Sequence, residues 1–274
     1  MIIDAHHHLW QPARGDYHWM QGAPDILLRD YMPHHLEPLL ERFGVARTIV
    51  VQAAATRAET DFLLELAART DFIAGVVGWL DMEADDFADQ LRLYGGKPKF
   101  VGIRPMLQDI NDDAWILRPT VLRNLGRIAD SGVAFDFLTF PRHLAHVATA
   151  LKNVPTLRAV IDHVSKPPIA SGAIEPWREA IARVAAFDGV HCKISGMITE
   201  ADAAAWRATD IEPYVHHAVA CFGADRLMFG SDWPVCRVVG EYGDVLAATM
   251  LSLPAELRGD RRIFSTNAAR FYRV

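Results

Sequence analysis

Short apolar runs rich in β-branched and aromatic residues recur along the chain, and a longer stretch with helical periodicity follows each of them. These runs lie at residues 2–10, 47–52, 72–79, 100–104, 133–139, 158–163, 190–195 and 226–232. Most of them lack the alternation of apolar and polar residues that marks a half-exposed strand. They therefore indicate strands buried on both faces, as in a parallel sheet covered by helices.

The stretches between the runs have apolar residues three and four positions apart, and several end at glycine. The first opens at Pro33, ends at Gly44 and has an apolar stripe made of Leu36, Leu39, Leu40 and Phe43. Eight such units predict an α/β protein with a (β/α)8 TIM barrel fold, as a single domain over residues 1–274. An open, doubly wound sheet is the alternative. The lack of a glycine-rich phosphate loop after the first strand disfavours it.

The first run, Ile2 to Trp10, contains three consecutive histidines. Side chains alternate between the faces of a strand, so Asp4, His6, His8 and Trp10 are expected on one face and His7 on the other. Two imidazoles on one face can reach a single metal ion. A tag remnant or a chance histidine cluster is the alternative, and the apolar strand pattern around the histidines argues against a tag.

Residues 11–32 form a long irregular segment between the first strand and the first helix. They contain two prolines and two glycines between Tyr17, Trp19 and Tyr31. A loop of this length inside a compact domain is usually either functional or disordered. Because its aromatic residues favour packing, we interpret the segment as a lid over the barrel end from which His6 and His8 emerge.

Polar residues gather at the predicted strand ends, which in such a barrel form the catalytic face. In chain order these residues are His6, His8, Gln52, Trp79, Arg104, Asp136, His163, Lys193, Ser195 and Asp232. A single charged strand end is compatible with a core polar group. Convergence from all eight strands favours a common pocket.

Composition excludes several other classes of protein. The chain is 51% hydrophobic and 23% charged, with a net charge of −6, so nothing favours nucleic acid or an anionic membrane as a partner. Its three cysteines lack metal-ligand spacing and do not indicate a disulfide framework. No cationic leader and no apolar run of membrane-spanning length occurs, which predicts a cytoplasmic protein. The oligomeric state stays open.

Three motifs together resemble the amidohydrolase superfamily. They are Asp-x-His-x-His-x-Trp from Asp4 to Trp10, Asp162-His163 with Lys166-Pro167, and Phe229-Gly-Ser-Asp-Trp-Pro234. The likeness is greatest to amidohydrolase family 2, in the branch with sugar lactonases of the L-fuconolactonase and L-rhamnonolactonase type and 2-pyrone-4,6-dicarboxylate lactonase. It extends over essentially the whole chain.

The resemblance implies a hydrolase that opens a sugar-acid lactone with the help of one divalent metal ion. Many superfamily members carry a bridging lysine or glutamate at strand four and a metal-binding histidine at strand five. Here Arg104 and Asp136 stand at those positions, which argues against a binuclear centre. The expected ligands of the single ion are His6, His8, His163 and Asp232, and zinc suits such nitrogen and carboxylate ligands. The pyrone lactonase branch works without metal, so an ion that is dispensable is an alternative.

The chemistry of lactone hydrolysis suggests the roles of the remaining residues. Asp232 is the expected base and can return its proton to the leaving oxygen. Arg104 or Lys193 is expected to stabilise the oxyanion, with His163 also in the catalytic set. Substrate contacts are expected from Trp10, Gln52, Trp79, Asp136 and Trp233. Arg104 and Asp136 alternatively form a buried ion pair that braces the barrel.

Three other functions compete with sugar-lactone hydrolysis. They are hydrolysis of a pyrone dicarboxylate, metal-dependent decarboxylation of an aromatic acid as in other family 2 enzymes, and ligand binding by an inactive barrel. Intact His6, His8 and Asp232 argue against the last, because a binding protein does not need a base beside paired imidazoles.

Overall fold

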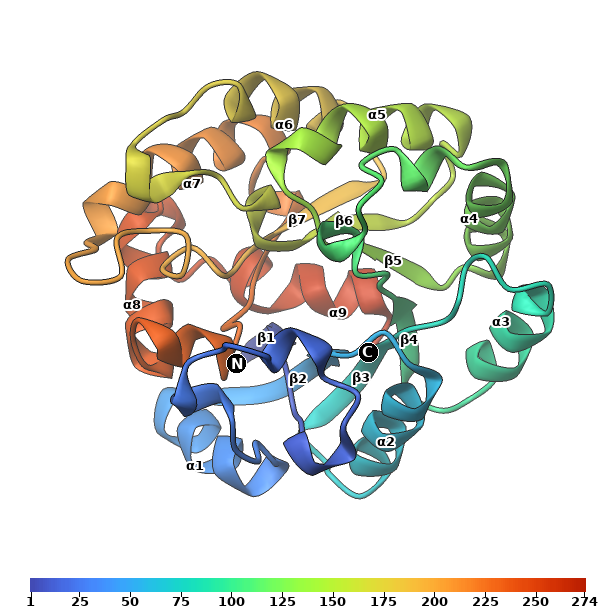
Figure 1. The fold of residues 1–274 in the computed structure, drawn as a ribbon. Helices are drawn as coiled ribbons and strands as arrows, with labels where there is room; N and C mark the ends of the chain where they lie inside the picture. Colours follow the sequence, from blue (N-terminus) through green and yellow to red (C-terminus); the bar gives the residue numbers. More distant parts are fainter.

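Eight parallel strands form a ring, and all helices but the last lie outside it (Figure 1). The computed structural model describes residues 1–274. The strands pair in chain order and are β1 Ile2–His7, β2 Val45–Val51, β3 Ile73–Gly78, β4 Phe100–Ile103, β5 Ala134–Phe137, β6 Ala159–Ile161, β7 Val190–Ile194 and β8 Leu227–Phe229. The predicted (β/α)8 barrel is confirmed.

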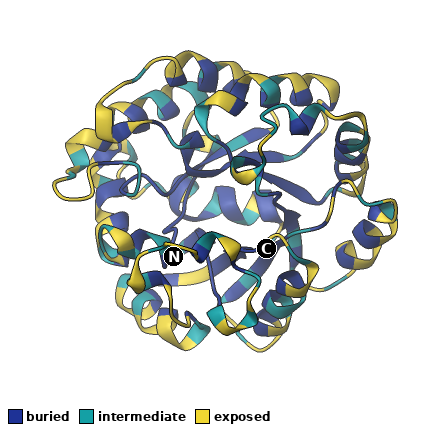
Figure 2. Ribbon diagram, viewed as in Figure 1, coloured by how far each residue is buried: buried dark blue, intermediate teal, exposed yellow.

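One helix follows each strand, and a ninth ends the chain. They are α1 Pro33–Phe43, α2 Arg57–Ala68, α3 Phe87–Gly95, α4 Pro119–Ser131, α5 Leu144–Asn153, α6 Trp177–Ala185, α7 Ala208–Phe222, α8 Tyr242–Ser252 and α9 Asn267–Tyr272. Their exposed residues lie on the outer side of the molecule (Figure 2). None of these helices has the length and apolar content needed to cross a membrane.

Proline and glycine mark the boundaries of α1 and α4. Pro33 and Pro119 occupy the first turns of α1 and α4, where the missing N–H costs no hydrogen bond. Gly44 and Gly132 end these helices with φ of 67° and 69°, a left-handed conformation that glycine adopts without steric cost.

The ring closes between β1 and β8 through a few hydrogen bonds. The N–H of Asp232 donates to the carbonyl of His6 at 2.8 Å, and the N–H of His8 donates to that of Trp233 at 2.7 Å. Gly230 permits this approach, because a Cβ there would lie 2.6 Å from the Cβ of His6. The closure holds the ends of β1 and β8, and the residues that follow them, in register.

Two hydrophobic clusters fill the molecule. The larger, of 70 buried residues, packs the outer side of the strands against the helices. The smaller, of 11 residues, lies inside the barrel and includes Phe271 and Tyr272 of α9. In Figure 1 this helix crosses the middle of the ring. The barrel is therefore a packed core, with room for chemistry only at its other end.

The alternation expected along β1 holds for the histidines but not for Asp4. A register shift between Asp4 and His7 moves the pattern by one residue. Ala5 consequently belongs to the inner cluster, and the Asp4 carboxylate accepts a hydrogen bond from Tyr242 of α8 at 3.1 Å. His7 points away from His6 and His8, with its Nε2 2.8 Å from Oγ1 of Thr48.

Candidate active site

Four side chains from three strand ends converge at the C-terminal rim of the barrel. Nε2 of His6 and Nε2 of His8 lie 3.2 Å apart. Oδ1 of Asp232, after β8, is 3.4 Å from the His8 nitrogen and 3.7 Å from the His6 nitrogen. Nε2 of His163, after β6, lies 3.9 Å from the same oxygen. The structure thus brings together the four residues expected around an ion.

The hydrogen-bond partners indicate which ring nitrogens carry lone pairs. Nδ1 of His8 lies 2.7 Å from the carbonyl oxygen of Val51, which can only accept, so Nδ1 carries the proton and Nε2 does not. Nη1 of Arg104, which can only donate, lies 3.4 Å from Nε2 of His6. Both Nε2 atoms therefore present lone pairs toward the same space.

This donor set fits a divalent metal ion. Oδ1 of Asp232 is buried without a hydrogen-bond partner, and it faces the two imidazole nitrogens. Lone pairs and a carboxylate at such separations repel one another unless a cation lies among them. Nitrogen and carboxylate ligands of this kind suit zinc. His163 belongs to a neighbouring group with His6 and Asp162 and lies beside the first set.

A network of buried charges supports His6 from below. Nζ of Lys193 lies 2.6 Å from Oδ2 of Asp136, 3.0 Å from Oδ1 of Asp162 and 3.3 Å from Nδ1 of His6. Nη1 of Arg104 lies 3.2 Å from Oδ2 of Asp162. A direct ion pair between Arg104 and Asp136 was the alternative expected from the sequence. The structure instead pairs Arg104 with Asp162 and Asp136 with Lys193.

Burial and neighbouring charges set the protonation states. Burial lowers the pKa of His6 well below its ordinary value and that of His163 to about 4, so both imidazoles are neutral at pH 7. Burial alone would raise the pKa of Asp232, but His163, His6 and His8 outweigh it and hold the pKa below its usual range. Asp232 is therefore ionised, as a ligand or a base requires.

An unusual backbone carries the site residues after β6. His163, Val164, Ser165 and Lys166 all have left-handed φ, between 50° and 59°. Each such non-glycine residue costs about 1–2 kcal/mol, so the surroundings must hold the segment. The Val164 carbonyl accepts from the Trp177 indole at 2.8 Å, and Nδ1 of His163 lies 2.9 Å from Oγ of Ser195. Gly196 leaves space for the His163 ring, since a Cβ there would lie 2.6 Å from Nδ1.

A cavity of about 150 Å³ opens beside these residues. Its polar wall comprises His8, Arg104, Gln108, His163, Lys166 and Asp232, and its apolar wall comprises Trp10, Trp19, Ala53, Met106, Leu138 and Val235. Trp19 belongs to residues 11–32, and its indole donates to the Ala53 carbonyl at 2.7 Å. Residues 11–32 therefore contribute directly to the wall.

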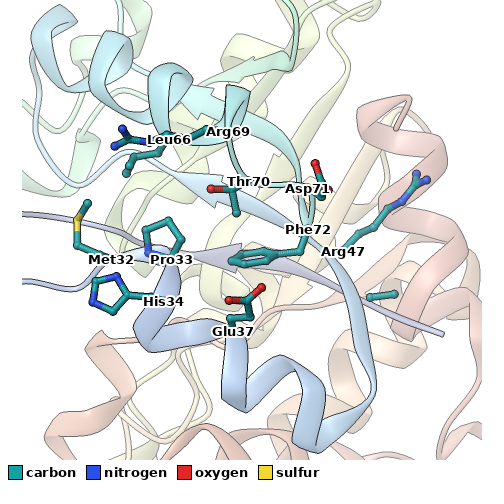
Figure 3. Close-up of a pocket in the computed structure, with 11 residues that line it drawn as sticks. Met32, Pro33, His34, Glu37, Arg47, Leu66, Arg69, Thr70, Asp71 and Phe72 are labelled. Carbon is teal, nitrogen blue, oxygen red and sulfur yellow. The ribbon is translucent and has the colours of Figure 1, made fainter.

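A larger hollow, of about 710 Å³, lies on the outside of the barrel between the start of α1 and the turn that leads into β3 (Figure 3). Its lining includes Pro33, Glu37, Arg47, Arg69 and Phe72. None of the residues at the C-terminal strand ends lines it. The smaller cavity is therefore the one that contains the chemistry.

Four residues expected to contact substrate do not line the cavity. The Gln52 amide donates to the Arg104 carbonyl at 2.7 Å, and Asp136 lies deeper, bonded to Lys193. Trp233 packs edge-on against Tyr31, with ring centroids 5.1 Å apart. Trp79 is the fourth of these residues, and it is also absent from the cavity wall. Trp10 does line the cavity, with its indole N–H donating to the carbonyls of Leu27 and Arg29.

The structure adds Asp162 and Lys166, which had no role in the sequence-based expectation. Both lie in the motif Asp162-His163-x-x-Lys166. Asp162 precedes His163 in the chain yet bonds to Arg104, which follows β4, and to Lys193 of β7. Lys166 reaches the cavity through the left-handed backbone. The spacing of apolar residues cannot reveal such a turn. The cluster of polar residues in the motif could have indicated that Asp162 and Lys166 belong to the site.

Comparison with known proteins identifies the family to which this fold and this set of site residues belong. A family model described as Amidohydrolase matches residues 3–274. The L-fucono-1,5-lactonase of Burkholderia ambifaria is 45% identical over 277 residues, covering 99% of this chain and 95% of that protein. The L-fucono-1,5-lactonase of Burkholderia multivorans is 36% identical over 285 residues, covering 98% and 95%.

A solved structure of an amidohydrolase from Burkholderia multivorans with bound Zn has a TM-score of 0.93 to this chain, at 36% identity, and covers 100% of this chain and 99% of that one. Another likeness is to a probable 2-pyrone-4,6-dicarboxylic acid hydrolase from Acinetobacter baumannii, with a TM-score of 0.84 at 15% identity, over 100% of this chain and 99% of that one. At that identity the likeness shows the fold alone.

Proposed function

The chain belongs to the amidohydrolase family, and from this premise we propose that it is a hydrolase that opens a sugar-acid lactone by adding water to the lactone carbonyl. The observation that carries the proposal is the convergence of His6, His8 and Asp232 beside a cavity at the C-terminal rim of the barrel. Two relatives named L-fucono-1,5-lactonase, at 45% and 36% identity over nearly the whole chain, support the substrate class.

We propose zinc as the divalent ion, held by His6, His8 and Asp232, with His163 beside them. The bound Zn in the relative of 36% identity supports this choice. When bound, the ion lowers the pKa of water and polarises a carbonyl. Asp162, with Oδ1 3.4 Å from Nδ1 of His6, orients that ring, and the Val51 carbonyl orients His8 through its Nδ1, as outer partners of ligand histidines commonly do.

The reaction needs one proton acceptor that later becomes a donor. Water attacks the lactone carbonyl carbon, and its proton passes to Asp232. The tetrahedral oxyanion then re-forms the carbonyl while the bond to the ring oxygen breaks, and the ring oxygen takes the proton back from Asp232. The product is a hydroxy acid that ionises to a carboxylate, so each turnover releases one proton.

The cavity wall favours a neutral, hydroxylated ring. Trp10 and Trp19 offer apolar faces, and Gln108 offers an amide to hydroxyl groups. A pyrone dicarboxylate would need several cations to pair with its carboxylates. Arg104 and Lys166 are the cationic residues in the wall, and the guanidinium of Arg104 already bonds to Asp162 and to the carbonyl of Gln52.

A lactone panel followed with a pH indicator tests the function. We expect higher kcat/KM on L-fucono-1,5-lactone or L-galactonolactone than on 2-pyrone-4,6-dicarboxylate, and about one equivalent of zinc per chain. Removal of the ion by a chelator should abolish turnover, and added zinc should restore it. Faster hydrolysis of the pyrone would contradict the substrate class, and full activity in chelator would contradict the role of the ion.

A further inference from the structure

The two cations expected to stabilise the oxyanion are already occupied. Nζ of Lys193 contacts Asp136, Asp162 and His6, is fully buried, and does not line the cavity. Arg104 lines the cavity, but Nη1 bonds to Asp162 and Nη2 bonds to the carbonyl of Gln52. Turning either group toward a substrate would break a buried ion pair, which is strongly unfavourable.

Lys166 is a third cationic residue near the site, and unlike Lys193 and Arg104 its charged group has no hydrogen-bond partner in the protein. It lines the cavity together with His163 and Asp232, and its side chain is 18% exposed. Its ammonium makes no hydrogen bond within the protein. The nearest carboxylate oxygen, Oε1 of Glu200, is 4.0 Å from Nζ, and the ring centroid of Phe140 is 5.2 Å away. An ammonium with free N–H groups on a side chain that is mostly buried favours an anion in the adjoining space.

The strained backbone aims Lys166 at the site. The left-handed run from His163 to Lys166 is held by the Trp177 indole on the Val164 carbonyl and by Oγ of Ser165, 2.9 Å from Oγ1 of Thr139. The N–H of Lys166 donates to the His163 carbonyl at 2.7 Å. One rigid turn therefore carries both His163 and Lys166, so their positions relative to Asp232 are fixed together.

We propose that Lys166 pairs with the negative charge that a neutral lactone acquires as it is opened, first on the oxyanion of the tetrahedral intermediate and then on the product carboxylate. This inference rests on the proposed lactone hydrolysis. The substrate carries no net charge, whereas the intermediate and the product each carry one negative charge. An interaction with Lys166 therefore strengthens along the reaction, as catalysis requires.

Glu200 is the counterpart that keeps Lys166 available. Its carboxylate is close enough to attract the ammonium but too distant to bond with it. A product carboxylate competes with Glu200 for the same cation. Removing the Glu200 charge should therefore strengthen binding of the product, while removing the Lys166 charge should weaken it.

The test compares Lys166→Met, Lys166→Arg, Glu200→Gln and the Lys166→Met/Glu200→Gln double variant, with the exposed Lys152→Met as control. For each variant, kcat and KM are measured on L-fucono-1,5-lactone, and the dissociation constant of sodium L-fuconate is measured by calorimetry. We expect Lys166→Met to lower kcat on the order of 100-fold with little change in KM. We expect it to weaken L-fuconate binding by about tenfold or more, and Lys166→Arg to recover part of both losses.

Glu200→Gln should tighten L-fuconate binding, and this gain should vanish in the double variant, which a merely structural role of Lys166 would not produce. Unchanged kcat and unchanged L-fuconate binding in Lys166→Met would overturn the inference. If the wild type opens no lactone but binds L-fuconate through Lys166, the proposed function fails while the assignment of Lys166 as the anion partner stands.

Discussion

Asp232 is the residue on which the proposed chemistry depends most directly. Its φ of 55° and its hydrogen bond to the His6 carbonyl turn the carboxylate back over the end of β1. The three histidines around it hold its pKa below the usual range, so Asp232 is ionised at pH 7. Proton transfer by a positioned group of this kind contributes about 10²–10⁴-fold to a rate.

Asp232→Asn should therefore lower kcat by about 10²–10⁴-fold, because an amide cannot take the proton from water. The matched control is Asp225→Asn, an exposed carboxylate just before β8, which should behave like wild type. Circular dichroism and metal analysis accompany the kinetics. A folded, metal-loaded Asp232→Asn protein with the wild-type rate would remove Asp232 as the base.

The face of a strand on which a side chain lies could be predicted from the sequence. The depth of that side chain below the C-terminal rim of the barrel could not. The alternation of side chains along a strand correctly predicted that His6 and His8 lie together and that His7 points away from them. It misplaced Asp4, because a register shift inside β1 leaves no trace in the pattern of apolar residues. It also could not separate Asp136, which lies below the site, from residues that line the cavity. Depth depends on the stagger of neighbouring strands, which only the closed barrel defines.

At the scale of elements, we propose that residues 11–32 act as a lid anchored to the segment between β2 and α2. The Trp19 indole bonds to the Ala53 carbonyl, and Oδ2 of Asp16 accepts from the Thr56 hydroxyl at 2.9 Å. Glu59 of α2 holds the backbone of the segment between β2 and α2 to which the lid is anchored. Its carboxylate accepts the N–H of Ala53 at 2.9 Å and also that of Ala54.

The pH dependence of unfolding tests this anchor. Burial raises the pKa of Glu59 from 4.5 to about 8. Between these values the folded state binds more protons than the unfolded state, so the Glu59 contribution to stability is lost as pH rises from about 4.5 to about 8. Glu59→Gln mimics the protonated form and should be increasingly more stable than wild type over that range. Urea unfolding at several pH values measures the difference.

Glu65→Gln provides the control, because Glu65 is exposed on the same helix. Its stability should follow that of wild type at every pH. An equal pH dependence in Glu59→Gln and wild type would mean that Glu59 is ionised in the folded protein, and the anchor would then be a charged one.

The order of elements could be predicted because helix and strand periods are local properties of the chain. The strand ends were less predictable. The run at residues 226–232 was expected to be one strand, yet β8 ends at Phe229. Ser231 and Asp232 leave the ladder because their N–H groups bond to the Asp4 carboxylate and the His6 carbonyl. These partners lie at the opposite end of the sequence, so no local pattern reports them.

At the scale of the whole molecule, α9 joins the end of the chain to the charge network inside the barrel. Tyr272 is buried, and its hydroxyl donates to Oδ2 of Asp136 at 2.7 Å. Asp136 in turn holds Lys193, which contacts His6. The chain thus connects its last helix to its first strand through a path of buried polar contacts.

Tyr272→Phe should separate stability from catalysis. It removes one hydrogen bond from a buried carboxylate, which should lower the free energy of unfolding by about 1–3 kcal/mol. Since Lys193 still holds Asp136 at 2.6 Å, kcat and zinc content should stay close to wild type. Tyr94→Phe is the matched control. Its hydroxyl bonds to Asp61 at 3.0 Å, and because that carboxylate is 47% exposed, the loss should be smaller. A large fall in kcat without a fall in stability would instead show that Asp136 tunes His6 through Lys193.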